Sequence, residues 1–177
     1  MASERDNSGL RHPVLMSDDE LLGECSVRRF RQSGPGGQHR NRVETAIELI
    51  HHPTGVTATA TERRSQFQNQ RVALRRLRIR LAVDVRTVTS PDVHASALWE
   101  SRCPDRRIHC SERHADFPVM LAESLNAIRA KDYDVRRAAA ALGCSTSQLI
   151  RFVARVPDAL VQVNAERRAR GLRLLKS

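Results

Sequence analysis

Aromatic residues are scarce in this 177-residue chain, at 3%, and no apolar run approaches the roughly 20 residues that a membrane-spanning helix needs. The first 20 residues contain no apolar segment of the kind found in a secretory signal, and they hold more acidic side chains than a transit peptide carries. These absences predict a cytoplasmic protein whose core is built from Leu, Val, Ile and Ala.

Cysteine is present at four scattered positions without a CxxC pair, which favours free thiols over a disulfide framework. One cluster, Cys103, His109, Cys110 and His114, has residue types that bind zinc. Its spacing is poor for that purpose, because Cys103 and His109 are too far apart for a ligand pair and His109 is adjacent to Cys110. The spacing favours an ordinary polar linker over a metal site, and no cofactor is expected.

Acidic residues are outnumbered, 20 against 30 basic ones, and the formal net charge is +10. An excess of this size implies a polyanionic partner, either nucleic acid or an anionic membrane surface. Eight arginines lie between Arg63 and Arg86, where Asp84 is the one acidic residue. This clustering favours contact with phosphates over a merely solvated basic surface.

The first half of the chain reads as a small α+β unit at 17–86, after a tail at 1–16 that we expect to be disordered. Ser17 and Glu20 form a capping-box signature for a short helix. Strands are predicted at 25–31, 45–51 and 56–60, the last two joined by a turn at Pro53 and Gly55. A long helix at 65–86 should cover the antiparallel sheet with one apolar stripe, made of Phe67, Leu74, Leu77 and Leu81.

The second half reads as a linker at 87–114 and an all-helical C-terminal domain at 115–177. Asp116, Asp134 and Ser145 are the predicted helix caps, and Gly143 marks a turn. The stretch Val135–Val153 resembles a helix-turn-helix, but a helical hairpin of no special function fits the same pattern. In the first case Gln148, Arg151 and Arg155 are the candidate nucleic-acid contacts.

The stretch "SGPGGQHRN", residues 33–41, places three glycines beside one glutamine, on a loop expected to project from the sheet. Its glycines do not fit GxGxxG, and no GK[ST] follows, so a nucleotide-binding loop is a poor explanation. The Gln38 side chain does not titrate, but its amide can position a water and its backbone N–H can stabilise developing oxygen charge. Three glycines alone would not distinguish this role from a turn with an incidental glutamine.

The residues around this loop resemble the catalytic domain of class I peptide chain release factors and their short ribosome-rescue relatives. The matching pieces follow the family's order and spacing over about 70 residues. They are Ser33-Gly34, the GGQH motif at 36–39, Asn41, HxPTG at 51–55, RSQ at 64–66, Asn69 and Ala73-Leu74.

The resemblance implies a monomeric hydrolase of the ester that joins a nascent peptide to tRNA. The loop would enter the peptidyl transferase centre of the ribosome, with Gln38 as the catalytic residue and Gly36 and Gly37 permitting its conformation. Gln38 would also be N5-methylated by a dedicated methyltransferase. The implied partners are large-subunit rRNA and peptidyl-tRNA, without a membrane. The expected RNA contacts are His39, Arg40, Asn41, Arg42, Arg64, Arg71, Arg75 and Arg78.

Two positions depart from the family pattern: Arg40 stands where a small apolar residue is usual, and Arg42 where Lys is usual. Because the residues before Ser17 are too few for a domain that reads stop codons, we expect hydrolysis that does not depend on the codon, as in ribosome rescue. Two alternatives remain: a non-catalytic RNA-binding protein that keeps the fold, and a DNA-binding regulator that acts through its C-terminal helices.

Overall fold

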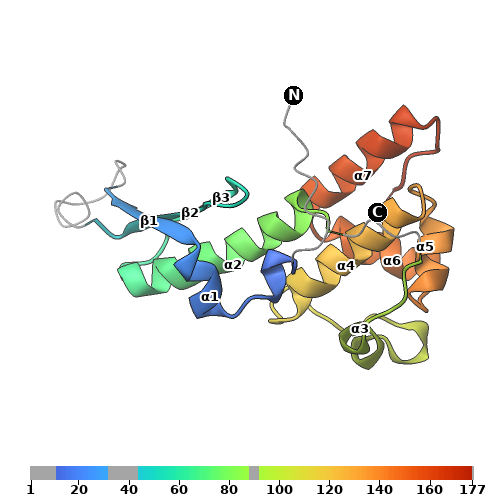
Figure 1. Cartoon of the computed structure of the whole chain (residues 1–177), viewed down its shortest axis with the longest axis horizontal. Coiled ribbons are helices and arrows are strands. Elements are labelled where there is room, and N and C mark those ends of the chain that lie inside the picture. Colours follow the sequence, from blue (N-terminus) through green and yellow to red (C-terminus); the bar gives the residue numbers. More distant parts are fainter. Residues whose placement is uncertain (1–10, 32–43, 88–91, 177) are drawn as a thin grey trace. The chain divides into compact units, whose positions relative to one another are not determined.

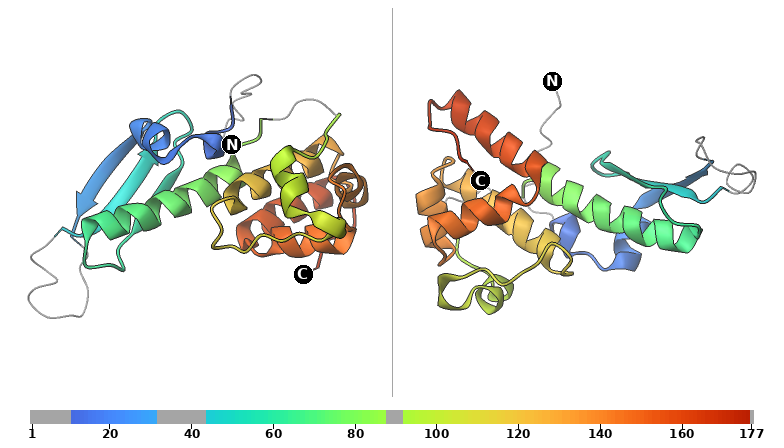
Figure 2. Two further views of the ribbon diagram at one scale, coloured as in Figure 1. Left: turned by 90° about the horizontal axis from the view of Figure 1, so that it is seen from below. Right: turned by 180° about the vertical axis from the view of Figure 1, so that it is seen from behind.

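The computed structural model describes residues 11–31, 44–87 and 92–176. They form two compact units, one made of the described residues between 13 and 84 and the other of those between 85 and 176 together with residues 11 and 12 (Figure 1, Figure 2). The domain boundaries at 16/17, 86/87 and 114/115 stay a prediction. The tail at 1–16 lies mostly outside the described residues.

The first unit is a three-stranded antiparallel sheet with one long helix on it, and it confirms the predicted α+β fold (Figure 1). The sheet order is β1-β2-β3. The elements in chain order are η1 (Pro13–Leu15), α1 (Asp18–Gly23), β1 (Cys25–Phe30), β2 (Ala46–His51), β3 (Thr57–Ala60) and α2 (Gln66–Asp84).

Local signals in the sequence account for most boundaries of this unit. The predicted capping box opens α1: Ser17 Oγ accepts from Glu20 N at 3.2 Å, and Glu20 Oε2 accepts from Ser17 N at 2.6 Å. The turn between β2 and β3 places Gly55 at φ +72°, a left-handed conformation that glycine adopts without a steric penalty.

The core of the first unit lies between α2 and the inner strands. Ile47 and Leu49 of β2 pair with Ala60 and Ala58 of β3, and all four side chains are buried. They lie on one face of the sheet because strand side chains alternate between faces. The residues of α2 buried in this unit include Ala73, Leu74, Leu77 and Leu81.

Phe67 does not belong to this core, and its predicted place in the apolar stripe is wrong. It lies in the first turn of α2, two turns before Leu74, and its exposed fraction is 67%. Helical periodicity gives the phase of a side chain around the helix. It does not give the length over which another element covers that face.

The second unit is a helical bundle, as the sequence predicts for its C-terminal part. Its elements are α3 (Ala97–Arg102), η2 (Pro104–Arg106), α4 (Phe117–Ala130), α5 (Val135–Ala141), α6 (Thr146–Ala154) and α7 (Pro157–Ala169). α4 packs against α5 and α6, and α6 also packs against α7. Asp134 and Ser145 cap α5 and α6 as predicted, while the side chain of Asp116 pairs with Arg102 and makes no cap hydrogen bond.

An aromatic cluster holds this bundle together. The ring of Phe152 lies 5.2 Å from that of Phe117 and 6.1 Å from that of Trp99, measured between centroids. Trp99 is fully buried, and its indole N–H donates to the Leu142 carbonyl at 2.7 Å. A residue in the segment predicted to be a linker thus contributes to the core of the second unit.

A helix-turn-helix is not confirmed for α5 and α6. Gly143 adopts φ +66° at the turn between them, but two of the three candidate contacts on α6 bind the protein's own backbone. Gln148 Oε1 accepts from Ile108 N at 3.5 Å, and Arg155 donates to the Cys110 carbonyl while lying over the Phe152 ring. The structure leaves Arg151 exposed.

The four cysteines are free thiols. Burial raises the pKa of Cys144 to about 12 and that of Cys25 to about 11, so both stay protonated at neutral pH and are poor nucleophiles. Within the described ranges, no group of His, Cys, Asp and Glu residues is arranged to hold a metal ion.

Replacing Trp99 with Phe should lower the free energy of unfolding of the second unit by about 1–3 kcal/mol. The substitution removes the donor to the buried Leu142 carbonyl and leaves unfilled volume beside Phe152. Urea unfolding followed by circular dichroism measures the loss, and an unchanged midpoint would contradict the role assigned to this hydrogen bond.

Candidate functional site: the root of the glycine loop

The predicted catalytic residues Gly36, Gly37 and Gln38, and the predicted RNA contacts at 39–42, lie outside the described residues. The structure does describe both ends of the chain that leads to them. β1 ends at Phe30, which pairs with Ala46 at the start of β2. Just beyond this pair, Arg31 Nε lies 3.5 Å from Glu44 Oε1. Segment 32–43 therefore begins and ends at one end of the sheet, on adjacent strands.

Side chains from the start of α2 bind the backbone where the chain enters β2. Gln66 Nε2 donates to the Glu44 carbonyl at 2.6 Å, and Asn69 Nδ2 donates to the Thr45 carbonyl at 2.6 Å. Asn69 is fully buried, and it also accepts from Arg63 N at 2.9 Å and donates to the Arg63 carbonyl at 3.0 Å. One amide thus joins the loop before α2 to the root of segment 32–43.

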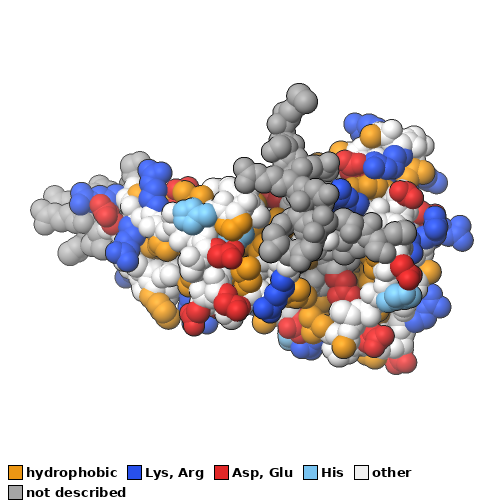
Figure 3. All heavy atoms as spheres, in the orientation of Figure 1, with side chains coloured by type: hydrophobic (Ala, Val, Ile, Leu, Met, Phe, Trp, Pro, Cys, Tyr) orange, Lys and Arg blue, Asp and Glu red, His pale blue; other side chains and the backbone are white. Residues whose placement is uncertain are grey.

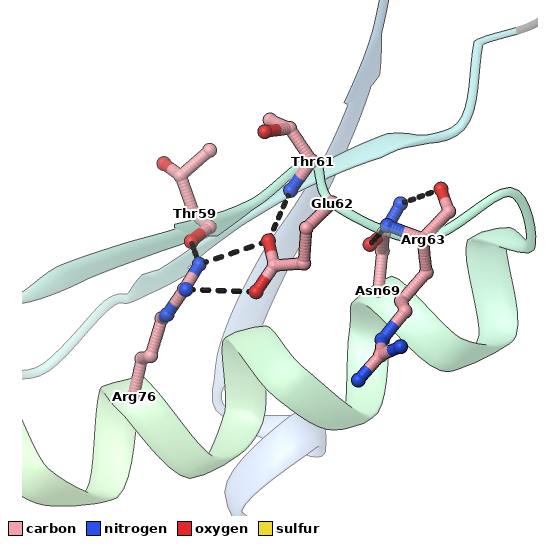
Figure 4. A network of polar contacts seen from close by, with 6 residues as sticks. All are labelled: Thr59, Thr61, Glu62, Arg63, Asn69 and Arg76. Carbon is pink, nitrogen blue, oxygen red and sulfur yellow. Dashed lines mark hydrogen bonds and ion pairs between the residues drawn. The ribbon is translucent and has the colours of Figure 1, made fainter.

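The loop before α2 carries a second polar network, drawn in Figure 4 together with Asn69. Arg76 binds Glu62 through two nitrogens, at 2.8 and 3.2 Å, and also donates to the Thr59 carbonyl at 2.7 Å. Glu62 accepts a hydrogen bond from the Thr61 N–H. This bond, together with the neighbouring Arg76, lowers the pKa of the Glu62 carboxyl. Because both side chains are about half exposed, the ion pair adds little to stability and mainly fixes the position of the loop on α2.

The same face of α2 protects the outer edge of the sheet. Arg80, one turn beyond Arg76, donates to the Thr57 carbonyl at 2.7 Å, so the two arginines bind alternate carbonyls of β3. Unpaired strand carbonyls at an edge invite pairing with another strand. These two arginines therefore have an architectural role.

The HxPTG motif also has an architectural role here. His51 is fully buried, with Nδ1 2.7 Å from Thr54 Oγ1 and Nε2 3.0 Å from Glu24 Oε2. Gly55 N donates to the His51 carbonyl at 2.8 Å and closes the turn. The imidazole thereby ties the β2–β3 turn to the residue that precedes β1.

The predicted RNA-contacting arginines of α2 and its approach differ in what surrounds them. Arg64, Arg71 and Arg75 are exposed. Arg78 has a side chain only 14% exposed, and its guanidinium contacts the Val14 carbonyl, the Met16 carbonyl and Asp18 at 2.7–3.0 Å. Its predicted contact with RNA therefore competes with bonds to the segment that precedes α1.

Basic side chains gather at the loop end of the first unit, where Figure 3 shows arginines around the tip of the sheet. At this end of the unit, the exposed arginines that have no acidic partner among the described residues are Arg29, Arg63, Arg64 and Arg71. The acidic residues of this end are each paired, Glu44 with Arg31, Glu48 with Arg28 and Glu62 with Arg76. The end of the unit that presents segment 32–43 thus carries a surplus of positive charge suited to phosphates.

Sequence reasoning picked out Gln66 and Asn69 as parts of a motif without predicting what they bind. The sequence did carry one signal: Asn69 is a polar residue on the same helix face as Ala73 and Leu74, which meet the sheet. A polar residue on such a face is expected to be buried and hydrogen-bonded. Its partners, the backbone of residues 45 and 63, are not visible in the sequence.

Comparison with known proteins assigns this unit. The family model described as "RF-1 domain" matches residues 22–107, which include every element of the loop root. This match, which runs from the first unit into the start of the second, supports a class I release factor domain at residues 22–107. The match confirms the resemblance of residues 33–74 to the class I release factor family.

Three curated relatives show how far the similarity extends. "Peptide chain release factor 1" of Frankia casuarinae is 37% identical over 131 residues, covering 63% of this chain and 37% of that protein. "Peptide chain release factor 2" of Staphylococcus haemolyticus is 38% identical over 89 residues, covering 43% and 24%. "Peptide chain release factor 1" of Thermotoga maritima is 45% identical over 58 residues, covering 33% and 17%. The chain thus spans about a third or less of the length of these relatives.

Among the described helices, none has both the length and the apolar character needed to cross a bilayer.

Replacing Asn69 with Ala should lower the free energy of unfolding of the release factor domain by about 2–3 kcal/mol. The substitution leaves buried backbone groups of residues 45 and 63 without their partner. Denaturant unfolding of the full chain measures the loss.

Gln68→Ala is the matched control, since Gln68 is the exposed neighbour of Asn69 on the same helix and its loss should change stability by less than about 0.5 kcal/mol. Equal losses in the two variants would show that Asn69 has no special role.

Proposed function

We propose that this protein hydrolyses the ester of peptidyl-tRNA in the peptidyl transferase centre of the ribosome. The observation that carries the proposal is a GGQ segment whose two ends leave a release factor domain from adjacent strands, with the chain behind them held by Gln66 and Asn69. A loop with a fixed root can deliver an amide into a site that another molecule builds.

In this mechanism Gln38 does the chemistry together with groups of the ribosome. Its side-chain amide positions the attacking water, and its backbone N–H stabilises the oxygen that gains negative charge as the ester breaks. Gly36 and Gly37 allow the backbone to approach the ester closely. The proposed step uses Gln38 and groups of the ribosome, without a cofactor.

The surrounding positive charge supports ribosomal RNA as the partner. His39, Arg40, Asn41 and Arg42 follow Gln38 in sequence. Arg64 and Arg71 are exposed at the loop end of the domain, and Arg75 is exposed one turn further along α2. We assign Arg78 instead to holding residues 14–18. We further propose that the protein acts as a cytoplasmic monomer and that a methyltransferase N5-methylates Gln38, which mass spectrometry of the loop peptide would detect.

We propose that hydrolysis does not depend on the codon, as ribosome rescue requires. Support comes from the match to the RF-1 domain, which covers the GGQ segment at 36–38, the part that would act on the ester rather than on the codon. The shared part is the one that presents the loop.

Gln38→Ala should reduce peptide release from stalled ribosomes by at least about 100-fold, because the water loses its positioning group. Gln38→Pro should be at least as defective, since it also removes the backbone N–H. Release is measured in single turnover at saturating protein, and ribosome binding, measured by co-sedimentation, should stay within about twofold for Gln38→Ala. Gln162→Ala, an exposed glutamine of α7, controls for the loss of a glutamine elsewhere.

The templates in this assay separate the remaining readings. Equal release on a truncated mRNA, a sense codon and a stop codon supports independence from the codon, whereas release on the stop codon alone contradicts it. Tight binding without release by the wild-type protein would favour a non-catalytic RNA-binding protein. Salt-dependent binding to duplex DNA in preference to ribosomes would favour the regulator.

A further inference from the structure

Phe67 is the most unusual side chain at the loop end of the release factor domain. The chain has only four phenylalanines, and this one is 67% exposed on the first turn of α2. It directly follows Gln66, whose amide binds the Glu44 carbonyl at the root of the GGQ segment. An aromatic ring thus stands in solvent beside the element that anchors the catalytic loop.

The surroundings of Phe67 are basic. Arg71 lies one turn further along the same face of α2, a spacing at which side chains are neighbours, and Arg64 lies three residues before Phe67. Both arginines are exposed, and neither has an acidic partner within the described residues. Arg63 adds a third exposed charge, and its side chain extends away from the Asn69 contacts (Figure 4). The nearby Glu62 is bound to Arg76, so its charge is largely balanced.

This combination suits a nucleic-acid base better than an apolar protein surface. An aromatic ring offers a face on which an unpaired base stacks, while arginines on either side contact the flanking phosphates. An apolar partner would leave at least two guanidinium groups to be desolvated without counter-charges, which is costly.

We propose that Phe67 stacks on an unpaired base of ribosomal RNA, with Arg64 and Arg71 on the adjacent phosphates. The inference rests on the proposed function, since it takes the ribosome as the partner. It adds a contact that fixes where α2, and with it the root of the GGQ segment, lies on the RNA. Phe67 is then a positioning residue, which acts on the reaction through the placement of the loop.

Binding of the full-length protein to purified large ribosomal subunits tests this proposal. Phe67→Ala should raise the Kd by about tenfold or more, the usual effect of removing one stacked aromatic side chain. Phe67→Trp should keep the wild-type Kd, and Phe67→Leu should resemble Phe67→Ala, because Leu is apolar but cannot stack. Val161→Ala, which truncates an equally exposed apolar side chain on α7, should change the Kd by less than twofold.

Salt dependence separates the ring from its charged neighbours. Phe67→Ala should weaken binding by the same factor at low and high salt, because stacking displaces no counterions. Arg71→Ala should reduce the slope of log Kd against log salt by about 0.7–0.9, the value for one phosphate contact.

Several outcomes would overturn the proposal. Wild-type affinity of Phe67→Leu would indicate an apolar protein contact, and wild-type affinity of Phe67→Ala would remove the site altogether. Because the assay reads binding, it is independent of peptide release. If Phe67→Ala loses affinity but the wild-type protein releases no peptide, the hydrolase proposal is refuted and the stacking contact stands. If the wild-type protein releases peptide but Phe67→Ala binds with wild-type affinity, the stacking contact is refuted and the hydrolase proposal stands.

Discussion

The buried amide of Asn69 is the contact on which the rest of the release factor domain depends. It joins the first turns of α2 to the loop after β3, six residues earlier, and to the entrance to β2, 24 residues earlier. A buried side-chain amide must have its donors and acceptor satisfied, so it permits one arrangement of these backbones and penalises the others. That arrangement holds the start of the long helix against the sheet and fixes the backbone where segment 32–43 leads into β2.

The arginines of α2 show that a basic cluster can serve more than one purpose. Arg76 and Arg80 bind the edge of β3, and Arg78 binds the segment before α1, so these three guanidinium groups have partners within the fold. Arg64 and Arg71 are directed to solvent at the loop end. The net charge of the helix therefore overstates the charge that is available to a polyanion. The position of an arginine along the helix decides whether its guanidinium is available to contact phosphates.

Much of the architecture could be predicted from local signals. A capping box, helix N-caps, glycines at left-handed positions and strand alternation predicted α1, the β2–β3 turn and the helices of the second unit, because these features depend on residues a few positions apart. Two kinds of feature escaped. The exposure of Phe67 depends on which element covers the start of α2, and the partners of Gln148, Arg155 and Trp99 lie 40 or more residues away. For the site, the motif predicted which residues matter, while only the structure supplies the reason that Gln66 and Asn69 belong to it.

The hydrogen bonds along the outer edge of β3 limit where a further strand could join the sheet. With its Thr57 and Thr59 carbonyls bonded to guanidinium groups, that strand offers little to an incoming chain. Among the described strands, the other margin of the sheet is β1, which pairs with β2 alone. A further strand, from this molecule or another, would therefore have to pair with β1, at the edge of the sheet opposite Arg76 and Arg80.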